Sequence, residues 1–292
     1  MLITLVLMVV MALFEAYAQS NFAPKTGIYN YYEYLSRNTY RYIFEENNKI
    51  SYWINVTKQK SGAYTIDNGD GVSFITMHWD NNTRERFLML IDDDFLCLYN
   101  SDNLPVFFGY YYDVLYWDIR TEANNKLEGL TLSELQNVTA SNSLMEGGID
   151  YSPTPQRLGL KINSAWAVRG GVHESLFCEV EWYGGYEEPF LYISPGYVAY
   201  SKPYLYKENS RPKKIRIYDF YDKSNFRDYE LADTPNFQII DIGQFARKTR
   251  YYSWSTETVA AKIQIEILEI YPGTKYKDTC INSVIYFSYS GQ

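Results

Sequence analysis

The chain has 292 residues and a net charge of −8, and aromatic residues make up 18% of it, with Tyr the most frequent of them. This length is typical of two domains, and the aromatic content favours β-strands and recognition surfaces. The acidic balance, without a stripe of clustered Lys and Arg, excludes a nucleic-acid partner bound through its phosphates.

Residues 1–18 predict export. The stretch from Leu2 to Phe14 is almost unbroken in its apolar character, and Ala16-Tyr-Ala18 forms a small-x-small cleavage site. This is the pattern of a secretory signal peptide, and the apolar run is too short for a spanning helix. We therefore expect an exported protein, periplasmic, at the cell surface or secreted, with no transmembrane segment in the mature chain.

Residues 19–122 predict a Tyr-rich β domain. Short apolar and aromatic segments alternate with turn sequences such as Asp67-Asn-Gly-Asp-Gly71 and Asp80-Asn-Asn82. The spacing is close to the ~8–12 residues of a meander. The sequence therefore predicts a small barrel or meander, because closing or covering the sheet removes its exposed edges. The expected strands are 40–44, 50–56, 62–66, 72–79, 86–91 and 95–99.

Residues 123–138 predict a polar connector. Thr131-Leu-Ser-Glu134 has the spacing of a capping box, in which the first and last side chains satisfy each other's backbone donors. We therefore expect one short helix near residues 131–137, leading into the second domain.

Residues 139–292 predict a second β domain. The segment 261–270 alternates apolar and polar residues almost strictly, which indicates a half-buried strand. About eight antiparallel strands with long loops are typical of a β-sandwich or jelly roll. The expected strands are 177–182, 190–194, 196–200, 213–218, 226–231, 238–242, 261–270 and 283–287.

Several motifs in this second half resemble a known family. They are Ala140-Ser-Asn-Ser143, Ile162-Asn-Ser-Ala-Trp166, Tyr204-x-x-Lys-Glu-Asn-x-Arg-Pro-Lys-Lys214, Leu231-x-Asp-Thr-Pro235 and Tyr271-Pro-Gly-Thr-Lys-Tyr-x-Asp-Thr-Cys-Ile281. The pattern resembles the NADase-type glycan-binding domain, one of the discoidin-like, galactose-binding-like domains of bacterial exported proteins. The resemblance implies an eight-stranded jelly roll, carbohydrate recognition through loops at one end, and no catalysis by this domain.

The segment 203–217 holds the strongest candidates for ligand binding. Tyr204, Tyr206, Asn209 and Arg211 precede a predicted strand, and Trp166 ends another motif. Aromatic faces pack on the C–H groups of sugars, while Arg and Asn donate to hydroxyl groups. The alternative is a packing network that fixes one end of the sandwich, with Trp166 in the core.

The three cysteines allow at most one disulfide within the chain. Cys178 and Cys280 both lie in apolar, strand-like settings, so they are either a bridged pair or two buried free thiols. None of the cysteine spacings fits a metal site.

We expect no cofactor. Calcium prefers six or more oxygen ligands, so Asp67, Asp70 and the acids of 92–94 are weak candidates for a site, as are Glu146 and Asp150 around a Gly-Gly turn. Turn chemistry is the simpler explanation of these acidic residues.

No nucleophile-elbow, P-loop or zinc-protease motif occurs in the sequence. The sequence therefore predicts a non-catalytic protein that recognises glycan or another cell-surface ligand through its second domain. Two alternatives remain open. One is a structural or adhesive envelope protein that binds other proteins, and the other is a glycoside-cleaving enzyme with an unrecognised carboxylate pair.

Overall fold

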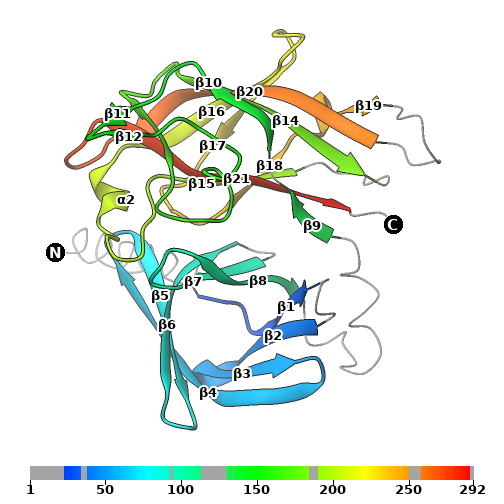
Figure 1. Ribbon diagram of the computed structural model, residues 1–292, viewed down its shortest axis with the longest axis vertical. Helices are drawn as coiled ribbons and strands as arrows, with labels where there is room; N and C mark the ends of the chain where they lie inside the picture. The colour runs from blue at the N-terminus through cyan, green and yellow to red at the C-terminus, as the bar shows by residue number, and fades with distance from the viewer. Residues whose placement is uncertain are drawn as a thin grey trace, which may run out of the picture.

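The computed structural model describes residues 23–33, 38–92, 95–112, 130–133, 135–183, 190–249 and 258–289. Figure 1 shows a β-barrel below and a β-sandwich above, which confirms the predicted mainly-β class. The predicted leader, residues 1–18, lies outside the described residues. Within the described ranges, no helix is long and apolar enough to span a bilayer.

The first half forms a closed barrel in which each strand pairs antiparallel with the next. Left-handed residues suited to tight turns, such as Asn55, Asp70 and Asn82, join neighbouring strands. The first and last strands were not predicted, yet their pairing closes the barrel, with Tyr29 opposite Tyr111. The strands are β1 (Gly27–Glu33), β2 (Asn38–Glu45), β3 (Lys49–Ile54), β4 (Thr57–Gly69), β5 (Val72–Trp79), β6 (Arg84–Ile91), β7 (Phe95–Tyr99) and β8 (Pro105–Tyr112).

The second half is a sandwich of two antiparallel sheets. The outer sheet contains β10 (Gln136–Ala140), β14 (Ser175–Tyr183), β20 (Thr258–Tyr271), β16 (Arg211–Asp219) and β17 (Phe226–Glu230), with β19 (Arg247–Thr249) beside β20. The inner sheet contains β13 (Trp166–Arg169), β21 (Asp278–Tyr289), β15 (Phe190–Pro195) and β18 (Gln238–Asp241), with β9 (Leu130–Ser133) beside β21. One apolar core joins their facing sides, with Ile217 and Ile265 from the outer sheet and Ile193 and Val284 from the inner.

Two predicted elements are wrong. The expected helix near 131–137 is replaced by β9 and β10, because each of these strands finds a pairing partner, β21 and β14. Tertiary pairing therefore overrides the local capping pattern. The expected strand at 196–200 is a loop. It begins at Gly196, which has a φ of +89°, and it buries Val198 against the barrel.

The inner sheet is buried on both faces, and this joins the two halves. Along β21, Val284 and Tyr286 point into the sandwich core, whereas Ile285 belongs to a separate cluster with the barrel wall. Phe95 on β7 is central to that cluster, where its ring lies 5.1 Å from the rings of both Tyr192 and Phe237. The barrel side of this cluster consists of the outward residues of β5 to β8, namely Val72, Phe74, Leu88, Leu90, Phe95, Cys97, Tyr99 and Phe108.

Polar contacts fix the register of this interface. The Asn236 side-chain oxygen accepts a hydrogen bond from the backbone N–H of Ile91 at 3.2 Å. The Asn103 side-chain oxygen accepts one from the backbone N–H of Tyr200 at 2.9 Å, and the Tyr200 hydroxyl donates to the carbonyl of Arg86. Backbone groups at the junction, including the buried N–H of Ile91, are thus satisfied by the opposite half, which favours one relative orientation of barrel and sandwich.

A single aromatic ring is clamped at the edge of this junction. Tyr206 comes from α2 (Leu205–Glu208), and its ring lies between Gly71 of the barrel and Gly196 of the sandwich. A Cβ atom added at Gly71 would approach Tyr206 Cδ1 to 2.6 Å. Only glycine fits at this position, which also has a φ of +84°.

Gly71→Ala is expected to lower the free energy of unfolding by about 2–3 kcal/mol, because it adds overpacking to left-handed strain. Gly147→Ala is the matched control, since Gly147 has a φ of +57° and no atom within 4 Å of an added Cβ. Urea denaturation of both variants separates the destabilisation due to the Tyr206 contact from that due to left-handed backbone strain. Equal losses in both would contradict the role of the Tyr206 contact.

Candidate functional site

Four of the five predicted ligand-binding residues lie in the interior. The exposed fraction is 0% for Trp166 and Tyr206, 3% for Arg211 and 8% for Asn209, whereas Tyr204 is 42% exposed. The prediction of a sugar site built from these side chains is therefore wrong for the four buried residues, and Tyr204 stays a prediction. Trp166 is a core residue that donates its indole N–H to the Asn142 carbonyl at 3.1 Å, so its ring offers no stacking platform.

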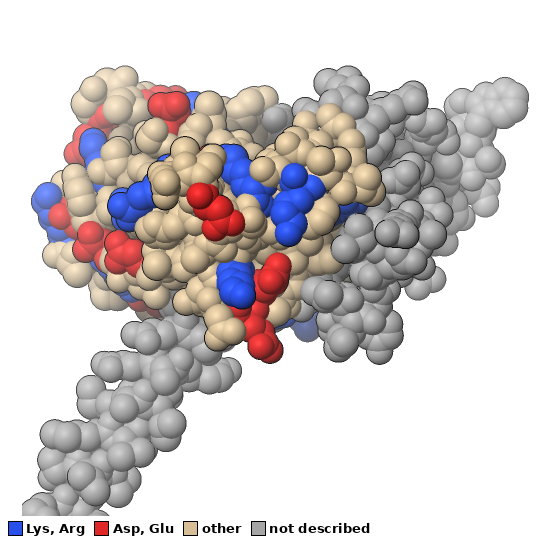
Figure 2. Space-filling view, turned by 90° about the horizontal axis from the view of Figure 1, so that it is seen from below, with Lys and Arg blue, Asp and Glu red and all other residues tan. Residues whose placement is uncertain are grey.

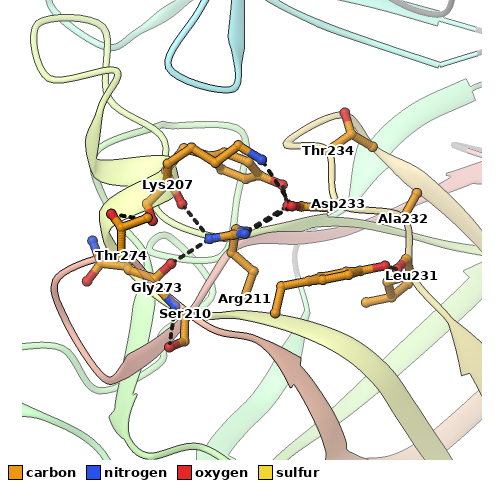
Figure 3. Close-up of polar contacts among 12 residues, drawn as sticks. Lys207, Ser210, Arg211, Leu231, Ala232, Asp233, Thr234, Gly273 and Thr274 are labelled. Carbon is orange, nitrogen blue, oxygen red and sulfur yellow. Dashed lines mark hydrogen bonds and ion pairs between the residues drawn. The ribbon is translucent and has the colours of Figure 1, made fainter. Parts of the chain in front are cut away.

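The buried residues instead form a packing network centred on Arg211 (Figure 3). The Arg211 guanidinium donates to both carboxylate oxygens of Asp233, at 2.8 and 3.0 Å. It also donates to the backbone carbonyls of Tyr206 and Asn209. Lys207 Nζ reaches Asp233 from the other side at 3.0 Å, and the Tyr206 hydroxyl donates to the same carboxylate. We call these residues, Tyr206, Lys207, Arg211 and Asp233, the Arg211–Asp233 latch.

The cations of the latch lower the pKa of Asp233 more than burial raises it. Burial opposes ionisation of Asp233, but hydrogen bonds and charges from Arg211 and Lys207 hold the pKa of its carboxyl below the usual value. The Arg211 side chain is only 4% exposed, so loss of its partner would leave a buried charge uncompensated. The latch ties α2 and the start of β16 to the loop before β18, and it supports the Tyr206 ring at the barrel junction.

Asp233→Asn is expected to destabilise the protein by about 3 kcal/mol at neutral pH. Because the folded pKa of Asp233 is depressed, its stabilisation is present above the unfolded pKa of about 3.9 and is lost as pH falls through the lower folded value. The free energy of unfolding of the wild type should therefore fall as the pH drops toward the folded pKa of Asp233. The Asp233→Asn variant should show a smaller fall over the same pH range. Urea denaturation as a function of pH tests this.

Asp67→Asn is the control, because the Asp67–Arg86 pair is largely exposed and such pairs contribute about 0–1 kcal/mol. A loss for Asp233→Asn no larger than that of the control would contradict the structural role of the latch.

The cysteines are free thiols. Cys178 points into the sandwich core, while Cys280 lies in a small cluster with Leu144, Ala165 and Ala167, so the two thiols belong to different environments. Of the two alternatives, the structure has buried free thiols rather than a Cys178–Cys280 disulfide. Burial raises the pKa of Cys97 and of Cys178 to about 12, which leaves these thiols protonated and unreactive at neutral pH.

The acidic residues weighed as calcium ligands do not converge. Within the described ranges, no three His, Cys, Asp or Glu side chains gather as a metal site requires. Asp67 pairs with Arg86, and the Asp150 carboxylate caps the backbone N–H of Ser152. Asp93 and Asp94 lie outside the described residues.

The outward face of the outer sheet carries aromatic side chains in one row. Phe177 on β14 is in register with Gln264 on β20, Gln264 with Tyr218 on β16, and Tyr218 with Phe226 on β17. Residues directly opposite in antiparallel strands share a face, so these side chains cross four strands side by side. Phe220 and Tyr221, in the loop after β16, extend the row. We call Phe177, Tyr218, Phe220, Tyr221 and Phe226 the aromatic strip.

The aromatic strip is accessible to solvent and held in place by its own contacts. Phe220, Phe226 and Tyr221 are 37%, 46% and 68% exposed. The Phe177 and Phe220 rings meet edge to face, as do those of Phe220 and Tyr221. A cluster of large exposed aromatics on one face is typical of a binding surface, whereas single exposed rings are common anywhere.

Cations and polar groups surround the rings. Arg216 lies 4.3 Å from the Phe226 ring centroid and Lys262 lies 4.5 Å from that of Phe220, both within cation–π range. Lys223 lies between the Tyr218 and Phe220 rings, where burial lowers its pKa. Gln264 lies within the row itself and hydrogen bonds to Lys223 and Ser175. The strip thus combines apolar faces with donors and acceptors.

Comparison with protein families identifies the second half. A model of the NAD glycohydrolase translocation F5/8 type C domain matches residues 132–288, which is more than half of the chain. The chain belongs to this family. The matched F5/8 type C region begins within β9 and ends within β21, so it covers both sheets of the sandwich and leaves the barrel outside.

Other comparisons add little. No curated protein matches the chain. One solved structure, described as "Structural basis for the promiscuous specificity of the carbohydrate-binding modules from the beta-sandwich super family", is 11% identical and covers 92% of this chain and 100% of its own, with a TM-score of 0.22. At that TM-score the likeness carries no argument about fold or ligand.

The aromatic strip was not predicted from the sequence. Alternation does place Lys214 and Arg216 on one face of their strand, and Tyr218 follows in the same period. The signal is weak because Phe177 and Cys178 are both apolar, so periodicity alone does not tell which of them faces solvent. The register between β14, β20, β16 and β17, which aligns the rings, is a property of the folded sheet.

Proposed function

We propose that this chain is an exported, non-catalytic protein that binds carbohydrate through the aromatic strip. The observation that carries the proposal is the in-register row of Phe177, Tyr218 and Phe226 on an exposed sheet face, extended by Phe220 and Tyr221. Aromatic faces pack on the C–H groups of sugar rings, and flanking polar groups bind hydroxyls. The resemblance of the second half to a glycan-binding domain supports the same ligand class.

The charges beside the aromatic strip favour an uncharged glycan over a phosphate-bearing ligand. Arg216 pairs with Asp228, Lys262 with Glu179, and Arg247 with Asp219. These paired cations have little free charge to offer a polyanion. Lys223 differs from them, since it hydrogen bonds to the neutral amide of Gln264 and burial lowers its pKa. Figure 2 shows the opposite, barrel side of the molecule, where basic and acidic residues are also interspersed.

Two observations support the remaining parts of the proposal. A general acid in a glycosidase needs a raised pKa, but hydrogen bonding to Arg216 lowers the pKa of Asp228, the carboxylate beside Phe226. This arrangement suits a fixed binding surface better than proton transfer. The apolar run from Leu2 to Phe14 and the Ala16-Tyr-Ala18 cleavage pattern support export.

Glycan-array screening followed by calorimetry of the full chain tests the proposal. Tyr221→Ala and Phe226→Ala are each expected to weaken glycan binding about fivefold to tenfold, because each removes one ring face. Both side chains are exposed, so the melting temperature should change little. Tyr204→Ala is the matched control, since Tyr204 is an exposed tyrosine outside the strip.

The absence of binding to any glycan on the array by the folded protein would overturn the proposal. Loss of binding in Tyr204→Ala, with full binding in Tyr221→Ala, would instead return the site to the loop segment 203–217. Release of reducing sugar by the wild type would favour the enzyme alternative.

A further inference from the structure

The inward side chains of the barrel change character along its axis. Most of the interior is filled by buried apolar and aromatic residues, among them Phe44, Ile75, Met77 and Leu98. An eight-stranded barrel is just wide enough either to be filled by its side chains or to hold one small ligand. The filled interior leaves room for a ligand only at an end of the barrel.

Two charged residues point inward at the end that carries the β3–β4 and β5–β6 turns. Lys60 is directly opposite Tyr52, and Glu85 is directly opposite Met77. Directly opposite residues share a face, and both Tyr52 and Met77 belong to the barrel interior. The side chains of Lys60 and Glu85 are 32% and 34% exposed, so solvent reaches this inward face.

The two charges form one fixed unit. Lys60 Nζ lies 2.5 Å from one carboxylate oxygen of Glu85, and the indole N–H of Trp79 donates to the other at 2.8 Å. Lys60 also lies 5.3 Å from the centroid of the Trp79 ring. The unit has no net charge, and it presents a cation and an acceptor side by side.

Tyrosine hydroxyls complete this inward surface. The Tyr42 and Tyr52 rings lie 4.9 Å apart, and Tyr42 also packs on Phe107. Burial, followed by a neighbouring tyrosine and then by the charge of Glu85, raises the pKa of both hydroxyls, so they are protonated donors. In the described part of the chain, neither hydroxyl has a hydrogen bond to another protein group. We call Tyr42, Tyr52, Lys60, Trp79 and Glu85 the barrel mouth.

We propose that the barrel mouth is a second binding site, which takes one uncharged, polyhydroxylated ring the size of a single monosaccharide. The filled interior below it makes the site shallow, which limits the ligand to about one ring. The internally neutralised Lys60–Glu85 pair disfavours a charged ligand. Tyr52 is only partly buried and offers an unpartnered hydroxyl and a ring face, which match the hydroxyl groups and C–H faces of such a ring. Tyr42 and Trp79 are buried and hold Tyr52 and Glu85 in place from the interior. This site is independent of the aromatic strip, which lies on the far side of the sandwich.

Saturation-transfer difference NMR of the full chain with D-glucose, D-galactose and N-acetyl-D-glucosamine tests this site. At least one sugar is expected to bind saturably, and Tyr52→Phe is expected to weaken its binding about fivefold by removing one hydroxyl. Glu85→Gln should weaken it at least as much. Tyr221→Ala, in the aromatic strip, should leave this binding unchanged.

Each other outcome overturns the barrel mouth as a sugar site. These outcomes are no binding by the wild type, full binding by Tyr52→Phe, or loss of binding in Tyr221→Ala alone, which would assign the signal to the strip. Tighter binding of D-glucosamine or D-glucuronate than of the neutral sugars would overturn the uncharged class. Tyr52→Phe changes one partly exposed hydroxyl, so it remains informative if Glu85→Gln fails to fold.

Discussion

The fold depends on one sheet that is buried on both faces. The inner sheet of the sandwich supplies Val284 and Tyr286 to the core between the two sheets, and Ile285 and Tyr192 to the cluster against the barrel wall. The middle of β15, Leu191–Ile193, and the segment Val284–Phe287 of β21 are accordingly continuous apolar runs, as expected for strands without a solvent face. The barrel and sandwich together bury this sheet, so each half covers apolar surface that the other would expose.

This constraint determines which surfaces remain free for binding. The sandwich faces solvent through its outer sheet, where the aromatic strip lies, and the barrel does so through its ends and the wall away from β5 to β8 (Figure 1). The first part of the segment 203–217 lies at the junction of the two halves, where Tyr206 meets Gly71 of the barrel, and the rest runs along β16 in the outer sheet. Tyr206, Asn209 and Arg211 are buried in this segment, and Arg211 holds Asp233, whereas Tyr204 is exposed.

Strands were predicted correctly from the sequence where the side-chain period and the turn residues agree. The strands at 72–79 and 95–99 were predicted with their observed bounds, and the hairpin turn at Asp70 and Gly71 has the positive φ values that these residue types favour. The prediction was wrong where pairing between strands determined which element forms. Thr131 to Glu134 resembles a helix start, yet β9 forms there because β21 offers it a partner. β1 and β8 were missed because Asn30 and Gly109 interrupt their patterns.

The sequence by itself determined the β class, the division into a Tyr-rich half and a family-like half, and the resemblance that the family match confirms. These properties follow from local period, turn residues and short motifs. Only the tertiary structure decided which of the notable side chains face solvent. Arg211 and Trp166 have the chemistry of a sugar site but are buried, whereas Phe177, Tyr218 and Phe226 are unremarkable in sequence and become one surface through strand register. Residues far apart in the chain share a face only after the sheet has formed, so local pattern cannot reveal such a surface.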